Sequence, residues 1–323
     1  MSDRQGRPER ITEPAQIEAR SMQIIDEELQ ARGLTWKDLT DRKKWMEATL
    51  SDLMEEEKKK ENFQTFFESN REEFQFRRIQ NMLKRAIYYL SKAMGKDDFE
   101  QDVAELRIAL DPIPFVGDTA AVFVGKIDRI DVKETQQGRR IRIVDYKTGT
   151  NHFDMADFYY GVQLQLILYL SAVLKKRPKD IPEGVYYQMI RDRAEEGDDE
   201  KVEKERSKLY QLKGIGLEDV TSEEWPILLS YGEYMIRKIV GEIGEGNIKV
   251  EPFSERGKQP EACEYCNFHT ICGIGRIKNV EEVCRIKEIS GAKNNGVLIE
   301  RMKRDIEDET DEGTEESTNE DRE

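Results

Sequence analysis

Long apolar stretches are absent from this 323-residue chain, and no run approaches the length that a bilayer-crossing helix needs. The first residues, MSDRQGRPER, have no apolar stretch behind their charges, so we expect no secretory signal and a cytoplasmic protein. Histidine is scarce, with only two residues, and the four cysteines all lie late in the chain. A disulfide framework would spread along the chain, whereas metal ligands crowd together. The cysteines therefore predict a metal or cluster site.

Basic residues are outnumbered, and the formal net charge is −15. Much of the excess lies in residues 305–323, which hold eleven acids against the single Arg322. The remaining chain is only mildly acidic, and its 37% apolar and 37% charged residues are typical of a folded protein with long charged helices. A nucleic-acid partner needs a local basic surface rather than a positive total. The overall charge therefore neither supports nor excludes such a partner.

Changes in composition divide the chain into consecutive segments. The expected segments are a flexible lead-in at 1–15, a helical region at 16–98, a mixed core at 99–250, a cysteine-rich segment at 251–290 and an acidic disordered tail at 291–323. Within the core, short stretches rich in Val, Ile, Phe and Tyr predict strands at 103–110, 121–132, 140–147 and 184–190. Mostly apolar positions predict a buried helix at 154–174, and a further helix is expected at 222–243. The fold class is therefore α/β, with a mixed central sheet flanked by helices.

Two neighbouring strands end in a carboxylate–lysine group. Side chains alternate along a strand, so Asp145 and Lys147 share one face of the second strand. Asp128 on the adjacent strand of the hairpin can add a second carboxylate, and the Tyr146 carbonyl can turn towards it. Two carboxylates and a carbonyl form an all-oxygen site that suits Mg²⁺ or Mn²⁺. The pattern predicts phosphodiester hydrolysis by metal-activated water, with Lys147 orienting that water or offsetting charge on the phosphate.

A simpler interpretation is that Asp128 caps a turn and that Asp145 and Lys147 form a surface ion pair. The surroundings favour the metal site, because hydrophobic residues lead directly into both acids and Gly149 follows the lysine. Buried aspartates without a cation would be costly. The following helix also carries polar residues that could support the site, namely Gln163, Gln165 and Tyr169.

The motifs GKIDRID, IVDYKTG and FDMADFYYGVQLQLILYL resemble the nuclease domain of the AddB family, the second subunits of bacterial AddAB helicase–nucleases. The segments EGVYYQMI, KLYQLKGIGLEDV and CEYCNFHTICG extend the likeness over roughly residues 20–275. It implies a PD-(D/E)xK core of the RecB-nuclease kind, which acts with Mg²⁺ on DNA ends in double-strand break repair beside an AddA-like helicase partner. By matching position, Asp128 and Asp145 are metal ligands and Lys147 the catalytic lysine. Gln165 and Tyr169 match a glutamine–tyrosine helix motif that supports the site and the DNA.

The chain departs from that family in three ways. The long helicase-like region before the nuclease is absent, so the chain resembles a C-terminal part whose N-terminal fragment could be encoded separately. The histidine usual on the first nuclease helix is missing from the corresponding stretch, QIEARSMQII at 16–25. No cysteine precedes Cys263, although the family's first cluster cysteine lies before the nuclease domain.

By this resemblance, Cys263, Cys266 and Cys272 are three of the four ligands of a [4Fe–4S] cluster. Cys284 or a partner chain could supply the fourth ligand. With Cys284 or His269 the same thiols could instead hold Zn²⁺, or they could be unliganded. Two other functions also stay open: a catalytically weak remnant that serves as a DNA-binding or assembly module, and a stand-alone RecB-family nuclease. The basic pairs at 77–78 and 84–85 could contact phosphates in any of these.

Overall fold

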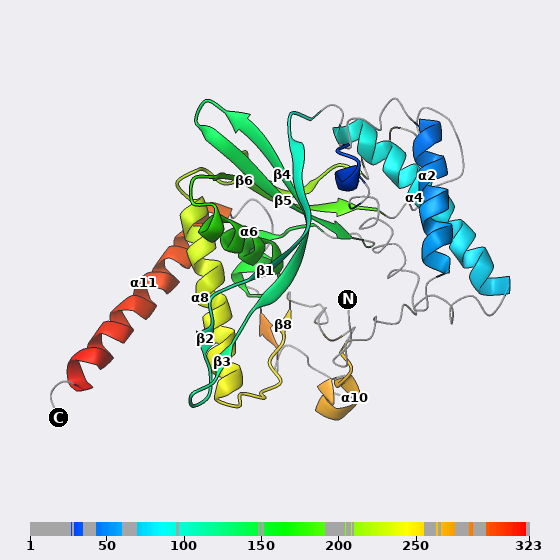
Figure 1. Cartoon of the computed structure of the whole chain (residues 1–323). Helices are drawn as coiled ribbons and strands as arrows, with labels where there is room; N and C mark the ends of the chain where they lie inside the picture. Colours follow the sequence, from blue (N-terminus) through cyan, green and yellow to red (C-terminus); the bar gives the residue numbers. More distant parts are fainter. Residues whose placement is uncertain are drawn as a thin grey trace. The chain divides into compact units, whose positions relative to one another are not determined.

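The chain divides into two compact units that interleave along the sequence (Figure 1). This computed structural model describes residues 27, 29–34, 43–59, 70–94, 97–147, 149, 152–190, 204, 208, 210–254, 263, 266–274, 284–286 and 295–320. Unit 1 comprises Met1–Ile108, Lys126–His152 and Arg177–Gly214, and unit 2 comprises Ala109–Gly125, Phe153–Lys176 and Ile215–Glu323. The consecutive segments expected from composition therefore do not coincide with the compact units, because contacts distant in sequence define the units.

A five-stranded sheet forms the centre of the fold, in the order β1-β4-β5-β6-β7. Its strands are β1 (Glu100–Ala109), β4 (Val124–Thr135), β5 (Gly138–Lys147), β6 (Ile181–Met189) and β7 (Lys213–Gly216). β4 and β5 pair antiparallel, and β5 and β6 pair parallel. The sheet is therefore mixed, which confirms the expected fold class. The short strand β7 was not predicted, since its sequence KGIG lacks the β-branched run of the other strands.

The β4–β5 hairpin determines which side chains share a face of the sheet. Its turn places Gly138 at φ 132°, and the Thr135 hydroxyl donates to the Gly138 carbonyl at 2.7 Å. The register pairs Arg129 with Val144 and Asp131 with Arg142. Residues paired across an antiparallel ladder lie on the same face. One face therefore carries Arg129, Asp131, Arg142 and Tyr146, and the opposite face carries the even positions of β4 and the odd positions of β5.

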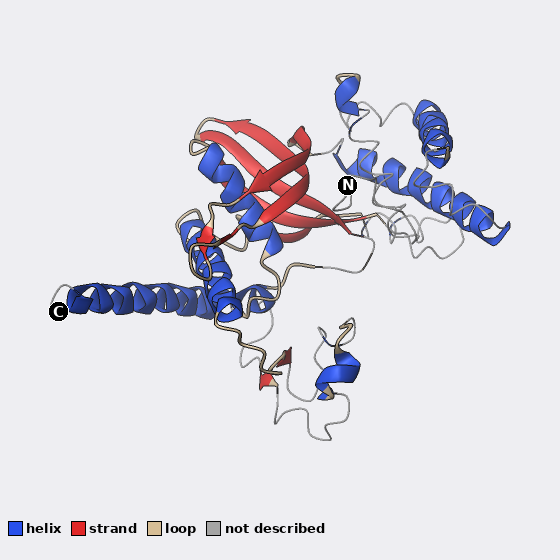
Figure 2. Cartoon of the chain, turned by 60° about the horizontal axis from the view of Figure 1, so that its bottom comes forward, coloured by secondary structure: helices blue, strands red, loops and turns tan. Residues whose placement is uncertain are grey.

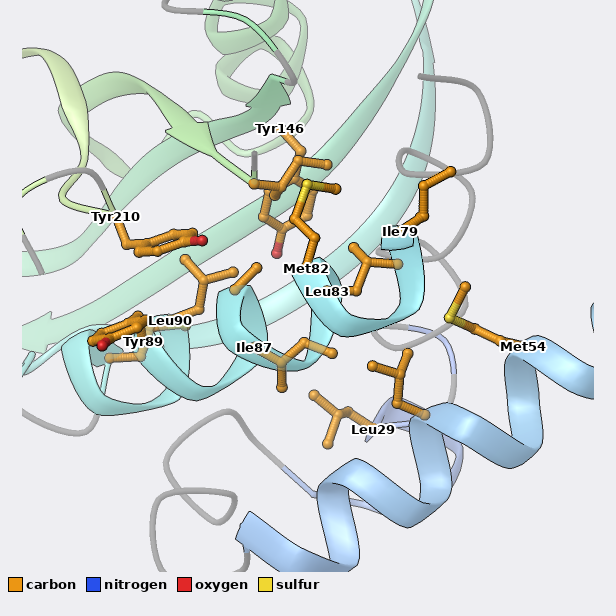
Figure 3. Packing of buried hydrophobic residues seen from close by; sticks show 14 of the residues in the cluster. Leu29, Met54, Ile79, Met82, Leu83, Ile87, Tyr89, Leu90, Tyr146 and Tyr210 are labelled. Atoms are coloured by element: carbon orange, nitrogen blue, oxygen red, sulfur yellow. The ribbon is translucent and has the colours of Figure 1, made fainter. Parts of the chain in front are cut away.

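The helices α2 (Lys43–Lys58) and α4 (Asn70–Met94) belong to unit 1. Apolar residues recur on one side of α4 at three- and four-residue spacing and are buried together with Leu50 and Met54 of α2. Tyr146 of β5 joins this cluster, beside Met82 of α4 (Figure 3). The cluster thus connects α4 to the strand that ends at Lys147.

In unit 2, the single helix predicted at 154–174 is wrong, because the segment forms α5 (Met155–Tyr159) and α6 (Gln165–Lys176). The Asp154 side chain caps α5 by accepting from the Ala156 and Asp157 amides. Gly161 adopts φ 77°, a left-handed conformation that ends the helix after one turn. The break separates the aromatic residues of α5 from the polar start of α6.

The disordered acidic tail predicted from residue 291 is also corrected, since α11 spans Asn295–Glu320 and ends near the C-terminus (Figure 2). Leu298, Ile299 and Met302 are buried, and α11 contacts both α5 and α8 (Trp225–Gly244). Three apolar positions within about one turn therefore anchor a helix whose composition is otherwise acidic. The helix expected at 222–243 corresponds to α8.

The remaining elements of unit 2 are short. They are the β2 (Ile113–Pro114) and β3 (Ala120–Ala121) pair, the β8 (Phe253–Ser254) and β9 (Arg285–Ile286) pair, and α10 (His269–Cys272). Over the part of the chain that the structure describes, no helix is both long and apolar enough to span a membrane.

Candidate active site

Asp128 and Asp145 face each other across the β4–β5 hairpin, within unit 1. The ladder pairs Arg129 with Val144, and continuing that register by one position sets Asp128 opposite Asp145. Both side chains then lie on the same face, together with Lys147. The structure thus brings together the three side chains that the sequence predicts as the site.

The contacts within this group are short. Lys147 Nζ lies 2.6 Å from Asp145 Oδ2, and the Tyr146 amide donates to Asp128 Oδ2 at 2.8 Å. The Lys147 ammonium also lies 5.3 Å from the centroid of the Tyr187 ring on β6. The Asp145 residue is only 4% exposed, so its pairing with Lys147 is not the surface ion pair of the simpler interpretation.

The two carboxyl groups are electrostatically unfavourable as neighbouring anions. Burial, and then the nearby charge of Asp145, raise the pKa of Asp128 to about 7, although the Tyr146 amide and Lys147 act in the opposite direction. Burial also raises the pKa of Asp145, and Lys147 opposes that rise. One ammonium is therefore insufficient to keep both carboxylates charged in this setting. The pair is arranged as a binding site for additional positive charge.

A divalent cation fits this donor set. Carboxylate oxygens are the ligands that Mg²⁺ and Mn²⁺ prefer, and a bound cation would offset the repulsion between the two aspartates. Among the residues that the structure describes, no group of three His, Cys, Asp or Glu side chains is arranged to hold a metal. A cation at Asp128 and Asp145 would therefore need further oxygens from the backbone, water or substrate.

Sequence reasoning missed a second ion pair on the same face. Lys126 lies two positions before Asp128 on β4 and forms an ion pair with Glu105 of β1. Lys126 also lowers the pKa of Asp128, against the dominant effect of burial. Glu105 has φ 58°, a left-handed conformation that is uncommon for a residue other than glycine. The two-residue alternation before Asp128 could have identified Lys126, but nothing local in the sequence indicates the conformation of Glu105.

The predicted supporting residues belong to unit 2 and have structural partners there. Gln163 accepts from the Asp154 amide at 3.0 Å and donates to Asp157 at 3.1 Å, so it bridges the break between α5 and α6. Gln165 Nε2 donates to the Tyr169 hydroxyl at 3.0 Å. These contacts correspond to polar helix residues with satisfied side chains.

Tyr169 also lies against the start of β4. A Cβ added to Gly125 would come within 2.5 Å of Tyr169 Cε1, which is closer than atoms can approach. Gly125 is the glycine of the GKIDRID motif, three positions before Asp128. The motif therefore needs a glycine here, because the buried tyrosine ring occupies the space of a side chain.

The cysteine thiols influence one another electrostatically. Burial, and then the Cys266 and Cys272 thiols, raise the pKa of Cys263. Burial and the Cys263 thiol raise the pKa of Cys284, so Cys284 lies within electrostatic range of Cys263. The donor set therefore holds the number of thiols that a four-coordinate metal site requires. The stretch at 16–25 that lacks the histidine lies outside the described residues, as does the side chain of His269.

Comparisons with known proteins agree with this geometry. A model of the PD-(D/E)XK nuclease superfamily matches residues 16–273. Similar curated proteins are named as one subunit of an ATP-dependent helicase/deoxyribonuclease. The protein from Alkaliphilus metalliredigens is 26% identical over 88% of this chain and 28% of its own length. The protein from Clostridium botulinum (strain Loch Maree / Type A3) is 25% identical over the same shares, and that from Acetivibrio thermocellus is 26% identical over 75% and 25%. The chain thus spans only about a quarter of the length of these relatives.

Proposed function

This chain belongs to the PD-(D/E)XK nuclease superfamily, and on that premise we propose that it hydrolyses DNA phosphodiester bonds with a divalent cation. Mg²⁺ or Mn²⁺ would be held by Asp128, Asp145 and the Tyr146 carbonyl. The observation that supports this most is the buried carboxylate pair, whose raised pKa values indicate a missing positive charge. When bound, the cation would lower the pKa of a coordinated water and polarise the phosphate.

Lys147 has the role of orienting the attacking water or offsetting charge that develops on the phosphate. Its Nζ is held between the Asp145 carboxylate and the face of the Tyr187 ring. Such a position limits the freedom of a flexible side chain before substrate arrives. Asp128 is held in turn by the Tyr146 amide, so both carboxylates are oriented before a cation binds.

The DNA strand is proposed to contact the solvent face of α4. Arg71, Phe74, Arg78 and Arg85 recur at helical spacing on that face, and all four are exposed, Phe74 at 67%. Arginines attract the phosphate backbone, and an exposed aromatic ring can stack on an unpaired base. The face therefore suits a single strand, such as one delivered by a helicase.

The relatives' names support an AddB-like role in double-strand break repair and recombination. We propose that this chain works beside an AddA-like helicase–nuclease partner, with a separate helicase-like fragment as a further partner. Cys263, Cys266 and Cys272 would hold a [4Fe–4S] cluster, with Cys284 as the fourth ligand. Zn²⁺ is the alternative for the same four thiols. A second candidate function is an inactive DNA-binding remnant, which the histidine-free stretch at 16–25 favours.

A cleavage assay separates these two functions. Purified protein would be incubated with labelled single-stranded DNA and either Mn²⁺ or Mg²⁺, alongside Lys147→Ala. Lys133→Ala is the matched control, because Lys133 lies on the same hairpin but pairs with the exposed Asp98. We expect cleavage by the wild type and by Lys133→Ala, and a loss of at least about 100-fold in Lys147→Ala. Equal cleavage by all three would remove Lys147 from the mechanism. Metal-independent DNA binding without cleavage by any of them, even with a helicase partner present, would favour the remnant.

A further inference from the structure

Arg129 is a fully buried arginine on the face of the sheet opposite the carboxylates. Its Nη1 donates to the Tyr146 hydroxyl at 2.8 Å, and its Nε lies 2.9 Å from Asp131 Oδ1. Its Nη2 donates to Asp131 Oδ2 at 3.2 Å, so the guanidinium holds both oxygens of one carboxylate. The Tyr146 ring lies 5.4 Å from the guanidinium carbon. One planar group therefore connects β4 to the side chain of Tyr146 on β5.

A buried network of opposite charges surrounds this arginine. Asp131 is fully buried too, and it also accepts from Arg142 Nε at 2.9 Å. Arg142 Nη2 reaches Asp97 Oδ2 at 2.7 Å, and its guanidinium lies 4.4 Å from the Phe99 ring. Removing charges from water is costly, and these pairs offset that cost only with good geometry. Apolar residues would stabilise this face as well, so stability alone does not explain a buried arginine here.

Tyr146 makes contacts on both faces of the sheet. Its amide donates to Asp128 on the site face, whereas its hydroxyl accepts from Arg129 on the opposite face. Its ring packs into the apolar cluster of α4, where Figure 3 shows it beside Met82. The side chain is thus fixed at its tip and along its ring. The peptide groups that flank Tyr146 are fixed with it.

We propose that Arg129 is a positioning residue for the cation site and acts through the hydroxyl of Tyr146. This inference rests on the proposed function, in which the Tyr146 carbonyl and Asp128 bind the cation. Arg129 sets the orientation of the Tyr146 backbone, which in turn holds Asp128. Partners of this kind behind a metal ligand typically change affinity by about 10- to 100-fold when they are removed. Lysine cannot replace Arg129, because one ammonium lacks the planar fork that holds Asp131 and Tyr146 together.

Tyr146→Phe tests this with little risk to the fold, because it keeps the ring and the backbone and removes only the hydroxyl. Tyr210→Phe is the matched control, since Tyr210 is buried in the same apolar cluster and its ring stacks on that of Tyr89. Mn²⁺ binding would be measured by calorimetry without DNA. We expect the dissociation constant for Mn²⁺ to rise about tenfold in Tyr146→Phe and to stay unchanged in Tyr210→Phe. Arg129→Lys should weaken Mn²⁺ binding at least as much as Tyr146→Phe.

Amide hydrogen exchange of the Tyr146 peptide provides a second measurement that does not depend on metal or activity. Faster exchange in Tyr146→Phe than in Tyr210→Phe is expected, because the strand end loses its restraint. Unchanged exchange together with unchanged Mn²⁺ affinity would overturn the proposal. If wild-type protein binds no Mn²⁺, the proposed function fails, and faster exchange would then show that the restraint exists without serving a cation. Unchanged exchange would overturn the restraint itself.

Discussion

Asp128→Asn should stabilise the metal-free protein while abolishing its response to metal. Asparagine has nearly the same shape as aspartate and can still accept from the Tyr146 amide, but it carries no charge beside Asp145. The pKa of Asp128 moves from an ordinary value of 3.8 to about 7. At 1.36 kcal/mol per pKa unit, ionising Asp128 in the folded state costs up to about 4 kcal/mol above pH 7. Asparagine avoids that cost.

The sign of the pH dependence follows from proton binding. Between pH 4 and pH 7 the folded protein holds a proton on Asp128 that the unfolded chain releases, so stability falls as pH rises through this window. Asp128→Asn should therefore match the wild type at about pH 4 and exceed it at pH 8, by a rise in Tm on the order of 5 °C.

Thermal unfolding at pH 4.5 and pH 8, with EDTA and with Mn²⁺, measures this effect. Asp98→Asn is the control, because the Asp98 side chain is 79% exposed and pairs with Lys133 in the same unit. We expect Mn²⁺ to raise the Tm of the wild type and of Asp98→Asn, but not of Asp128→Asn. A variant that is no more stable than the wild type at pH 8 without metal would refute the reasoning about the carboxylate pair.

Three further predictions address other parts of the chain. Gly125→Ala should displace the Tyr169 ring and lower the free energy of unfolding by roughly 1–3 kcal/mol, measured by denaturant titration, whereas Gly241→Ala meets no atom within 4 Å and should not. Cys284→Ser should lower the iron or zinc content per chain, measured by metal analysis and absorbance; full retention would exclude Cys284 as a ligand. Arg78→Gln should weaken binding of single-stranded DNA and make its salt dependence shallower by about one counterion, and an unchanged slope would remove Arg78 from the DNA surface.

The meeting of Asp128, Asp145 and Lys147 could be predicted from the sequence because the rule that governs it is local. Side chains alternate along a strand, and two strands joined by a short turn pair in one register. The residues behind the site follow no such rule. Arg129 and Arg142 alternate with apolar residues, as solvent-facing charges would, and only the packing of other segments against that face buries them.

The errors in the helices have the same origin. The apolar pattern at 154–174 continues through Gly161, and only its left-handed backbone ends α5. In α11, Leu298, Ile299 and Met302 are few among many acids, so composition indicates disorder. Their burial against α5 and α8 depends on segments that are distant in sequence. Local composition therefore predicts elements well only where neighbours along the chain supply the contacts.

A crystal grown with Mn²⁺ and examined by anomalous diffraction would test the central claim most directly. The account predicts a single strong anomalous peak within about 2.2 Å of carboxylate oxygens from both Asp128 and Asp145, and its loss in Asp145→Asn. A peak bound by one of these aspartates alone, or none at saturating Mn²⁺, would contradict the claim that the hairpin holds one cation between its two strands.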